Sequence, residues 1–327
     1  MALPDFLLVG APKAGTTALH AGLAGHPELF LSTPKEPKFF LCGGRPPAAQ
    51  NGPGDAHSVK EWVWDRAEYE QLFDPAPPGT LRGESTPLYL ADHVAHERMA
   101  RLIPEAKLIV VVRDPVDRAY SNWSHLWSDG LEPVGDFLEA CALEDERVAR
   151  GWAAFWRYKW QGRYGHHLAH LYACFPAEQV HVLRYRELVE SPAHALDGIC
   201  AHLGIERGVV DGIPDANVSS YIEPSRVNQA LQSAVRNGAR MGRHLPPRVW
   251  RSASQPLVWA LKRRRLQRPA LSPDDRAELR AYFADDIDLL ESLTGRCFGD
   301  WLVDQEPSPH SLRRQRHQLA AGNELRA

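Results

Sequence analysis

One short apolar segment constrains the fold of this chain more than any other. Residues 6–9 (FLLV) form an apolar run that enters a loop bounded by Gly10 and Gly15. A run of this length that ends at a glycine predicts a buried strand. Thr16 and Thr17 follow the loop and begin a segment that we expect to be helical. A strand, a glycine-bearing loop and a helix in this order predict a parallel α/β sheet.

The remaining patterns repeat this alternation of strands and helices. Residues 107–112 (KLIVVV) are almost entirely apolar and β-branched, as in the central strand of a parallel sheet. Asp114 and Pro115 follow as an N-cap and a first helical residue. Further strands are expected at 80–84 and 180–183, and further helices at 65–73, 92–103, 162–174, 191–203 and 272–293. We therefore predict an α/β fold in which helices flank a parallel central sheet that carries a P-loop-like phosphate-binding loop.

Length and composition indicate one large domain. With 327 residues, 44% of them hydrophobic, the chain can bury the core of a single large α/β domain. We expect this domain to span residues 1–305 and the polar, basic residues 306–327 to form a loose tail. Residues 42–59 and 214–270 show few periodic signals, and we expect irregular binding-site loops or a lid there.

Charge, cysteine spacing and hydropathy exclude several classes of function. A formal net charge of -3 at pH 7 gives no basic excess for nucleic acid. The five cysteines are scattered without CxxC spacing, which predicts reduced thiols and neither a disulfide frame nor a zinc site. Because residues 6–9 are too few for a signal peptide or a membrane span, we expect a cytoplasmic protein with no integral membrane segment.

The loop between Gly10 and Gly15 has the glycine spacing of a phosphate-binding loop. Its backbone N–H groups and the N-terminus of the following helix favour an anion. A nucleoside triphosphatase loop has lysine after the second glycine, but Thr16 stands there and Lys13 lies inside the loop. This difference argues against magnesium-dependent hydrolysis of ATP or GTP, whereas Lys13 can still neutralise a phosphate. A simple turn with a surface lysine is the alternative.

The segment GAPKAGTTALHAGLAGHPELF, followed by KEPKFF at residues 35–40, resembles the sulfotransferases that use 3'-phosphoadenosine-5'-phosphosulfate (PAPS). The similarity is to the bacterial and heparan-sulfate branch of that family. It implies that the loop binds the 5'-phosphosulfate end of PAPS. The residues to which it gives this role are Lys13, Ala14, Gly15, Thr16 and Thr17.

A second anion site is expected at Arg113, where a strand ends and a helix begins. Arg113 can hold a phosphate with two hydrogen bonds, and Ser121 lies two turns along the helix. An ion pair of Arg113 with Asp114 or Asp117 is the alternative. The segment VVVRDPVDRAYSNW resembles the motif that binds the 3'-phosphate in this family, which implies that role for Arg113 and Ser121. By the same resemblance Arg226, in a later basic loop, is a further candidate.

Glu36 is the candidate general base, because a carboxylate beside the sulfuryl group can take the proton of the acceptor. Lys13 and Lys38 would stabilise charge on the transferring group and on the leaving phosphate. In the branch that this chain resembles, a glutamate before a double phenylalanine is the proposed base, and Glu36 matches it. Glu84, at a strand end, is its rival, and His125 is a third candidate. A solvated Lys-Glu-Lys loop is the alternative to catalysis.

These patterns together predict a PAPS-dependent sulfotransferase. It would transfer the sulfuryl group in line to a hydroxyl or an amine of a small-molecule, glycan or lipid-like acceptor and release 3',5'-adenosine bisphosphate (PAP), with no metal. The acceptor pocket is expected at 42–59 and 214–270. The basic run at 262–265 would meet an anionic acceptor or membrane headgroups, or form a solvated helix face. A magnesium-dependent kinase-like transferase and a nucleotide-binding module without catalysis are the alternatives.

Overall fold

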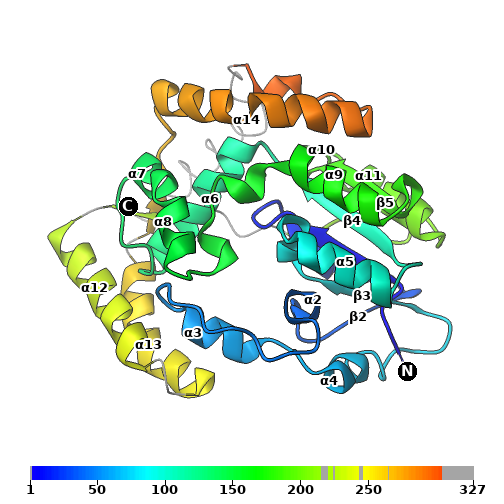
Figure 1. Cartoon of the computed structure of the whole chain (residues 1–327), viewed down its shortest axis with the longest axis horizontal. Coiled ribbons are helices and arrows are strands. Elements are labelled where there is room, and N and C mark those ends of the chain that lie inside the picture. The colour runs from blue at the N-terminus through cyan, green and yellow to red at the C-terminus, as the bar shows by residue number, and fades with distance from the viewer. Residues whose placement is uncertain (1, 215–219, 224, 243–245, 264, 304–327) are drawn as a thin grey trace, which may run out of the picture.

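Five parallel strands form the central sheet of the protein (Figure 1). The computed structural model describes residues 2–214, 220–223, 225–242, 246–263 and 265–303. The strands are β1 (Phe6–Gly10), β2 (Leu29–Leu31), β3 (Leu81–Ser85), β4 (Lys107–Val112) and β5 (Val180–Arg184). Their order is β2-β3-β1-β4-β5, and every neighbouring pair is parallel. The predicted fold class and its parallel central sheet are confirmed.

Four of these strands are the apolar runs that the sequence marks. β4 has the expected bounds, β1 and β5 extend one residue further, and β3 is shifted by one residue. β2 was not predicted, because its three residues are too few to show a period. It lies at the edge of the sheet, where β3 is the one strand with which it pairs.

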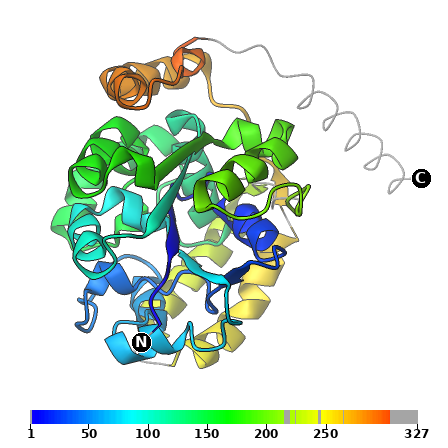
Figure 2. The same ribbon diagram turned by 90° about the vertical axis from the view of Figure 1, so that its right-hand side faces the viewer.

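Helices cover both faces of the sheet (Figure 2). The longer ones are α1 (Thr16–Leu23), α5 (His93–Leu102), α6 (Pro115–Ser128), α9 (Tyr164–Cys174), α11 (Pro192–Leu203) and α14 (Pro273–Thr294). Shorter ones are α2 (Phe39–Cys42), α3 (Asp55–Ser58), α4 (Arg66–Gln71), α7 (Phe137–Ala142), α8 (Glu144–Ala149) and α10 (Tyr185–Glu190). Asp65, Asp114 and Ser272 cap α4, α6 and α14 through their side chains, as their sequence context predicts.

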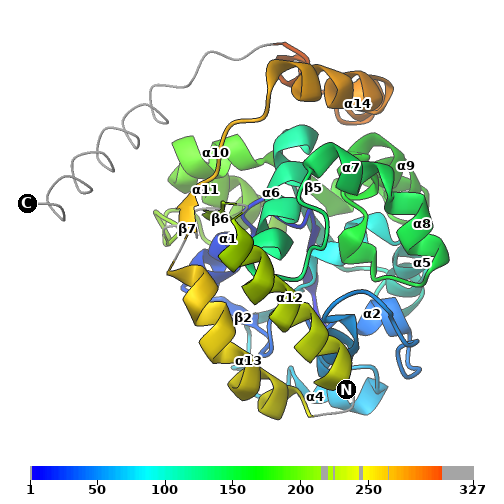
Figure 3. The ribbon, with the colours of Figure 1, turned by 90° about the vertical axis from the view of Figure 1, so that its left-hand side faces the viewer.

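The prediction of irregular structure at 214–270 was wrong. Two helices of 16 residues, α12 (Arg226–Met241) and α13 (Pro247–Lys262), lie side by side there (Figure 3). A short antiparallel ribbon pairs β6 (Ser220–Ile222) with β7 (Arg265–Gln267). Residues 215–219, 224, 243–245 and 264 of this region lie outside the described residues, and so does the expected tail at 306–327.

The composition of α12 and α13 explains why a hydrophobic count misses them. The buried face of α12 consists of Asn228, Gln232, Val235 and Ala239. Their spacing is helical, but half of them are amide side chains that hydrophobic periodicity does not register. Gln232 donates to the backbone carbonyl of Trp127 at 2.8 Å, so the buried amide has a partner. α13 carries Pro256 in its interior, a residue that normally predicts a helix end.

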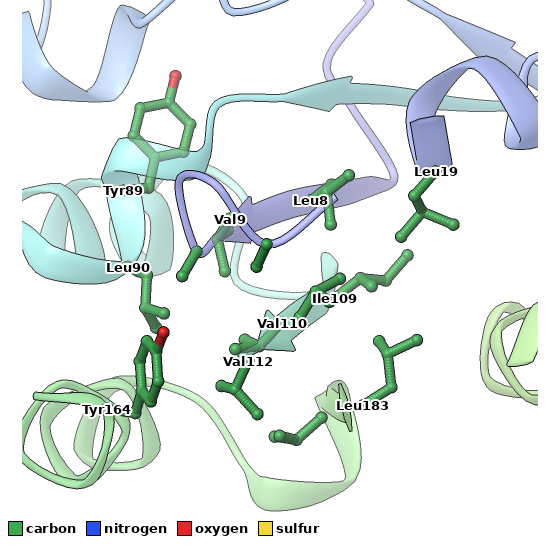
Figure 4. Packing of buried hydrophobic residues seen from close by; sticks show 14 of the residues in the cluster. Leu8, Val9, Leu19, Tyr89, Leu90, Ile109, Val110, Val112, Tyr164 and Leu183 are labelled. Carbon is green, nitrogen blue, oxygen red and sulfur yellow. The ribbon is translucent and has the colours of Figure 1, made fainter. Parts of the chain in front are cut away.

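The core packs around the central strands (Figure 4). Leu8 and Val9 of β1 and Ile109 and Val110 of β4 are at most 1% exposed. Both strands carry helices on their two faces, so apart from Lys107 at the start of β4 they contain no polar side chains. The core thereby fixes where β1 and β4 end. Lys13 follows β1 and Arg113 follows β4, so both lie at that edge of the sheet.

Among the described residues, no helix is both long and apolar enough to cross a lipid bilayer. All five cysteines are free thiols, as their spacing predicts.

The carboxyl ends of β3, β1 and β4 lie next to one another, because Leu8 pairs with Ser85 and Gly10 with Val110. The loops that leave these three strands therefore meet at one edge of the sheet.

Candidate active site

A cavity of about 1540 Å³ opens at this edge of the sheet. Most of the site residues predicted from sequence line it, namely Lys13, Gly15, Thr16, Thr17, Glu36, Lys38, Arg113, Ser121 and His125. Three predicted residues do not line it. Ala14 belongs to the loop but is buried, Glu84 is fully buried, and Arg226 is exposed at the start of α12.

Three side chains of this cavity stand on unusual backbone. Lys13, Glu36 and Lys38 have φ angles of 68°, 62° and 63°, and no other non-glycine residue in the described part of the chain has a positive φ. Such left-handed conformations are unfavourable for residues with a Cβ atom and persist where surrounding contacts hold them. The strain lies at the three positions that were singled out for catalysis, which supports a functional site there.

The first loop forms an anion cradle. Gly15 is the N-cap of α1 at φ 85°, and no side chain caps the first N–H groups of this helix. Uncapped N–H groups and the positive end of the helix dipole favour an anionic ligand. A Cβ atom on Gly15 would lie 2.8 Å from Cε2 of Tyr185, so the loop packs tightly against α10.

Lys13 and Arg113 meet inside the cradle. Nη1 of Arg113 donates to the backbone carbonyl of Lys13 at 3.2 Å. The guanidinium also lies over the ring of Tyr185, at 5.0 Å from its centroid. Burial lowers the pKa of the Lys13 ammonium to about 8, Asp129 raises it, and Arg113 lowers it further. The two cations therefore form a positive site that a bound anion would stabilise.

The alternative ion pairs of Arg113 are not formed. Asp114 accepts the N–H groups of Val116 and Asp117 as the N-cap of α6. Both aspartates pair with Arg276 of α14, with 3.3 Å between Arg276 Nη1 and Asp114 Oδ2. Within the described ranges no carboxylate lies within 4.0 Å of the Arg113 guanidinium, which stays directed at the loop.

Arg268 is a cavity residue that the sequence reasoning missed. Its guanidinium lies over the ring of Tyr120 at 4.2 Å, and no described residue is a hydrogen-bond partner of its buried Nη1 atom. Burial and the nearby charge of Arg113 lower the pKa of Arg268 to about 10. A buried cationic N–H that points to no acceptor suits an anionic ligand. In the sequence, its position shortly after the basic run at 262–265 is the one feature that indicates an anionic ligand for Arg268.

Glu36 lies between two lysines. Lys35 Nζ is 2.7 Å from Glu36 Oε1, and Lys38 Nζ is 3.9 Å from Glu36 Oε2. The Glu36 side chain is 34% exposed, so its carboxylate is accessible from the cavity. Lys38 also lies 5.7 Å from the ring centroid of Trp62, and burial lowers the pKa of its ammonium.

The rival bases occupy different surroundings. Glu84 is 0% exposed, and its two carboxylate oxygens accept hydrogen bonds from the hydroxyls of Tyr69, Thr86 and Tyr89. Burial raises the pKa of Glu84 to about 7. His125 lines the cavity, and its Nε2 atom is 3.8 Å from Oδ2 of Asp129 one turn further along α6. Of the three candidates, Glu36 is the carboxylate that the cavity exposes.

The other half of the cavity is lined by residues outside the cradle. Its walls include Arg45, Pro46, Pro47, Gln50, Trp62, Phe155, Arg157 and Trp160. Residues 45–48, 50 and 53–55, from the segment expected to form the acceptor pocket, contribute to it. From 214–270, among the described residues, Pro214 and Arg268 line the cavity.

The chain is similar to known proteins both in sequence and in structure. The sequence model of a family described as "Sulfotransferase family" matches residues 4–208. A crystal structure of a sulfotransferase from Alicyclobacillus acidocaldarius superposes with a TM-score of 0.71 at 28% identity, covering 92% of this chain and 99% of that one.

Two human proteins show the range of curated relatives. Heparan sulfate glucosamine 3-O-sulfotransferase 3B1 is 30% identical over 210 residues, or 64% of this chain and 48% of that protein. Bifunctional heparan sulfate N-deacetylase/N-sulfotransferase 2 is 30% identical over 214 residues, or 62% of this chain and 22% of that protein. The chain thus spans less than half the length of these relatives.

Proposed function

This chain belongs to the sulfotransferase family, and on that premise we propose that it transfers a sulfuryl group from PAPS to a hydroxyl or an amine of a small-molecule, glycan or lipid-like acceptor. One observation carries the proposal. Arg113 and the anion cradle around Lys13 lie in one cavity and are joined by the 3.2 Å hydrogen bond from Arg113 to the Lys13 carbonyl. A ligand with two anionic ends fits such a paired site.

The residues present suit PAPS. The uncapped N-terminus of α1 and the Lys13 ammonium would hold its 5'-phosphosulfate. Arg113, Ser121 and Arg268 would hold its 3'-phosphate, and the unpartnered Nη1 of Arg268 supports this assignment. When bound, PAPS would supply the sulfuryl group. Arg226 is exposed at the start of α12 and does not line the cavity, so we give Arg268 the role first considered for Arg226.

The catalytic roles follow from exposure and charge. Glu36 would accept the proton of the acceptor, because its carboxylate faces the cavity between two lysines. Lys13 and Lys38 would offset the negative charge that develops on the leaving phosphate and the transferring group. Both ammonium groups are partly desolvated, which strengthens their interaction with an anion.

The half of the cavity that lies outside the cradle would receive the acceptor. The named acceptors of the two human relatives are heparan sulfate chains. Aromatic rings such as Trp62, Phe155 and Trp160, together with Arg45 and Arg157, line this half and suit a ring-bearing acceptor with hydroxyl or amine groups.

Calorimetric titration with PAP, beside ADP with and without magnesium, tests the proposal. We expect tight, magnesium-independent binding of PAP that Arg113→Ala weakens at least tenfold. Arg66→Ala serves as a matched control, since Arg66 pairs with Glu70 on the surface of α4. Equal affinity for PAP and ADP would overturn the proposal. Magnesium-dependent ADP binding would favour a kinase-like transferase, and PAP binding without turnover of PAPS would favour a module without catalysis.

A further inference from the structure

A buried carboxylate lies beneath the loop that carries Glu36 and Lys38. Glu84 is the penultimate residue of β3, is 0% exposed and does not line the cavity. Its Oε1 atom accepts hydrogen bonds from the hydroxyls of Tyr69 at 3.2 Å and Tyr89 at 2.7 Å. Its Oε2 atom accepts one from the hydroxyl of Thr86 at 2.8 Å. Three hydroxyl groups therefore donate hydrogen bonds to a carboxyl group that solvent does not reach.

Two of these hydroxyls also accept hydrogen bonds from the backbone of the loop that carries Glu36 and Lys38. Oγ1 of Thr86 accepts the backbone N–H of Lys38 at 3.2 Å, and the hydroxyl oxygen of Tyr89 accepts the N–H of Phe40 at 3.3 Å. These N–H groups lie at the start of α2, where no intrahelical acceptor exists for them. A hydroxyl that donates to a carboxylate becomes a better acceptor for a second donor. Glu84 thus reaches the loop through two hydrogen-bond relays.

Aromatic packing reinforces the same contact. The ring of Phe39 stacks on Tyr69 with centroids 4.2 Å apart and planes inclined by 8°. Phe40 meets Tyr69 and Tyr89 edge-on, at 5.6 Å and 5.5 Å. The two tyrosines that bind Glu84 are therefore also the surface on which the double phenylalanine rests.

The loop needs such support because its backbone is strained. Glu36 and Lys38 both adopt positive φ, a conformation that surrounding contacts must hold. The hydrogen bond from Lys38 N to Thr86 fixes one of these residues directly. Without it, relaxation of the loop would move the Glu36 carboxylate and the Lys38 ammonium together.

We propose that Glu84 is a positioning residue that holds Glu36 and Lys38 in their reactive conformation through Thr86 and Tyr89. This inference rests on the proposed function. It also removes Glu84 from the list of candidate bases, because its oxygens are occupied and shielded from the cavity. Within the described part of the chain Glu84 has no basic partner, so three hydroxyl groups bind its carboxyl group in place of a counter-ion.

The test compares Glu84→Gln and Thr86→Val with the control Thr294→Val. Gln keeps the shape of Glu84 and removes its charge, whereas Val removes the relay to Lys38 and leaves the carboxylate in place. Thr294 makes the same kind of relay far from the cavity, since it donates to Leu290 and accepts the N–H of Arg296. The measurements are amide hydrogen exchange of residues 35–42, PAP affinity, and kcat with the KM values for PAPS and acceptor.

We expect faster exchange at Lys38 and Phe40 in both variants and PAP affinity within about twofold of the parent chain. The kcat should fall roughly 10- to 100-fold, as for a misplacement of about 1 Å. The double variant should be no slower than the more severe single variant, because both changes act on the Thr86 relay. The control should change none of these quantities.

Other outcomes would overturn the inference. Parental exchange and kcat in Glu84→Gln would exclude a positioning role. Loss of turnover in Glu84→Gln alone, with Thr86→Val at the parental rate, would make Glu84 the proton acceptor. A parallel loss of PAP affinity would place Glu84 in cofactor binding. If the parent chain binds no PAP, the proposed function fails, whereas hydrogen exchange still tests the hold of Glu84 on the loop.

Discussion

Arg113 donates a hydrogen bond from Nη1 to the backbone carbonyl of Lys13 at 3.2 Å, although the two residues are 100 positions apart in the chain. The bond joins the loop after β1 to the end of β4. It therefore holds the Arg113 guanidinium against the backbone of the Lys13 loop before any ligand arrives. A preorganised pair of this kind loses less entropy when it binds a ligand with two anionic ends.

Lys13 should make PAP affinity depend on pH. Burial lowers the pKa of its ammonium in the free protein to about 8, and an anion binds the protonated form. As the pH rises above about 8, affinity should fall by up to ~10-fold per pH unit, because binding must first restore the proton. Arg at this position stays charged, so Lys13→Arg should lose this decline. Calorimetry across this range measures both, and an unchanged decline in Lys13→Arg would assign it to another group.

Replacing Glu36 should separate catalysis from cofactor binding. Glu36→Gln removes the proton acceptor and should lower kcat by ~10²- to 10⁴-fold. PAP affinity should change little, because Lys13 and Arg113 remain in place. Glu68→Gln, on the exposed side of α4, is the matched control. A Glu36→Gln variant with full turnover would show that the proton leaves by another route.

Local rules allowed most of the sheet and part of the site to be predicted. The strands near Lys13 and Arg113 are continuous apolar runs, and Asp114 with Pro115 marks the start of α6. Parallel strands place their carboxyl ends at one edge, so the proximity of Lys13 and Arg113 follows from topology.

What could not be predicted depends on contacts between distant segments. Arg268 directly follows β7 of the β6–β7 ribbon and lines the cavity, and no local periodicity in the sequence predicts this position. The helix α12 buries Asn228 and Gln232, whose polarity hides its helical period. The sequence left Glu84 as a rival base, and its burial beneath three hydroxyls emerges only from packing.

Replacing Arg268 and replacing Arg226 should have different effects on the affinity for the cofactor. Arg268→Ala removes a buried, unpartnered guanidinium N–H in the cavity and should weaken PAP binding by roughly 10- to 100-fold. Binding of adenosine 5'-phosphosulfate, which has no 3'-phosphate, should weaken far less. Arg226→Ala should leave both affinities unchanged, since Arg226 is exposed outside the cavity. The reverse ranking in calorimetry would return the 3'-phosphate to Arg226.

Five histidines meet where α5 packs against α9, and they should make the fold sensitive to acid. They are His93, His96, His166, His167 and His170. Nε2 of His96 donates to the carbonyl of Leu90 at 3.1 Å, and Nε2 of His167 donates to that of Trp160 at 2.8 Å. Burial lowers the pKa of His96 to about 3 and that of His93 to about 4, and it lowers the pKa of His167 well below its usual value.

These depressed values set the sign of the pH effect. The unfolded chain binds protons on these histidines near pH 6.5, whereas the folded chain resists protonation until about pH 4 or below. The contribution of these histidines to stability is therefore fully present above about pH 6.5. It declines as the pH falls toward 4, by up to ~1.4 kcal/mol per pH unit for each fully buried group. The thermal midpoint should drop steadily over this interval.

Two variants assign the acid effect to this cluster. His96→Gln keeps a side-chain N–H for the carbonyl of Leu90 and cannot be protonated, so its thermal midpoint should decline less steeply below pH 6.5. His194→Gln replaces an exposed histidine on α11 and should leave the slope of the parent chain. If both variants keep the parental slope, the acid sensitivity arises from other groups, because a cluster that excludes protons must lose part of its pH dependence when one of its buried members is removed.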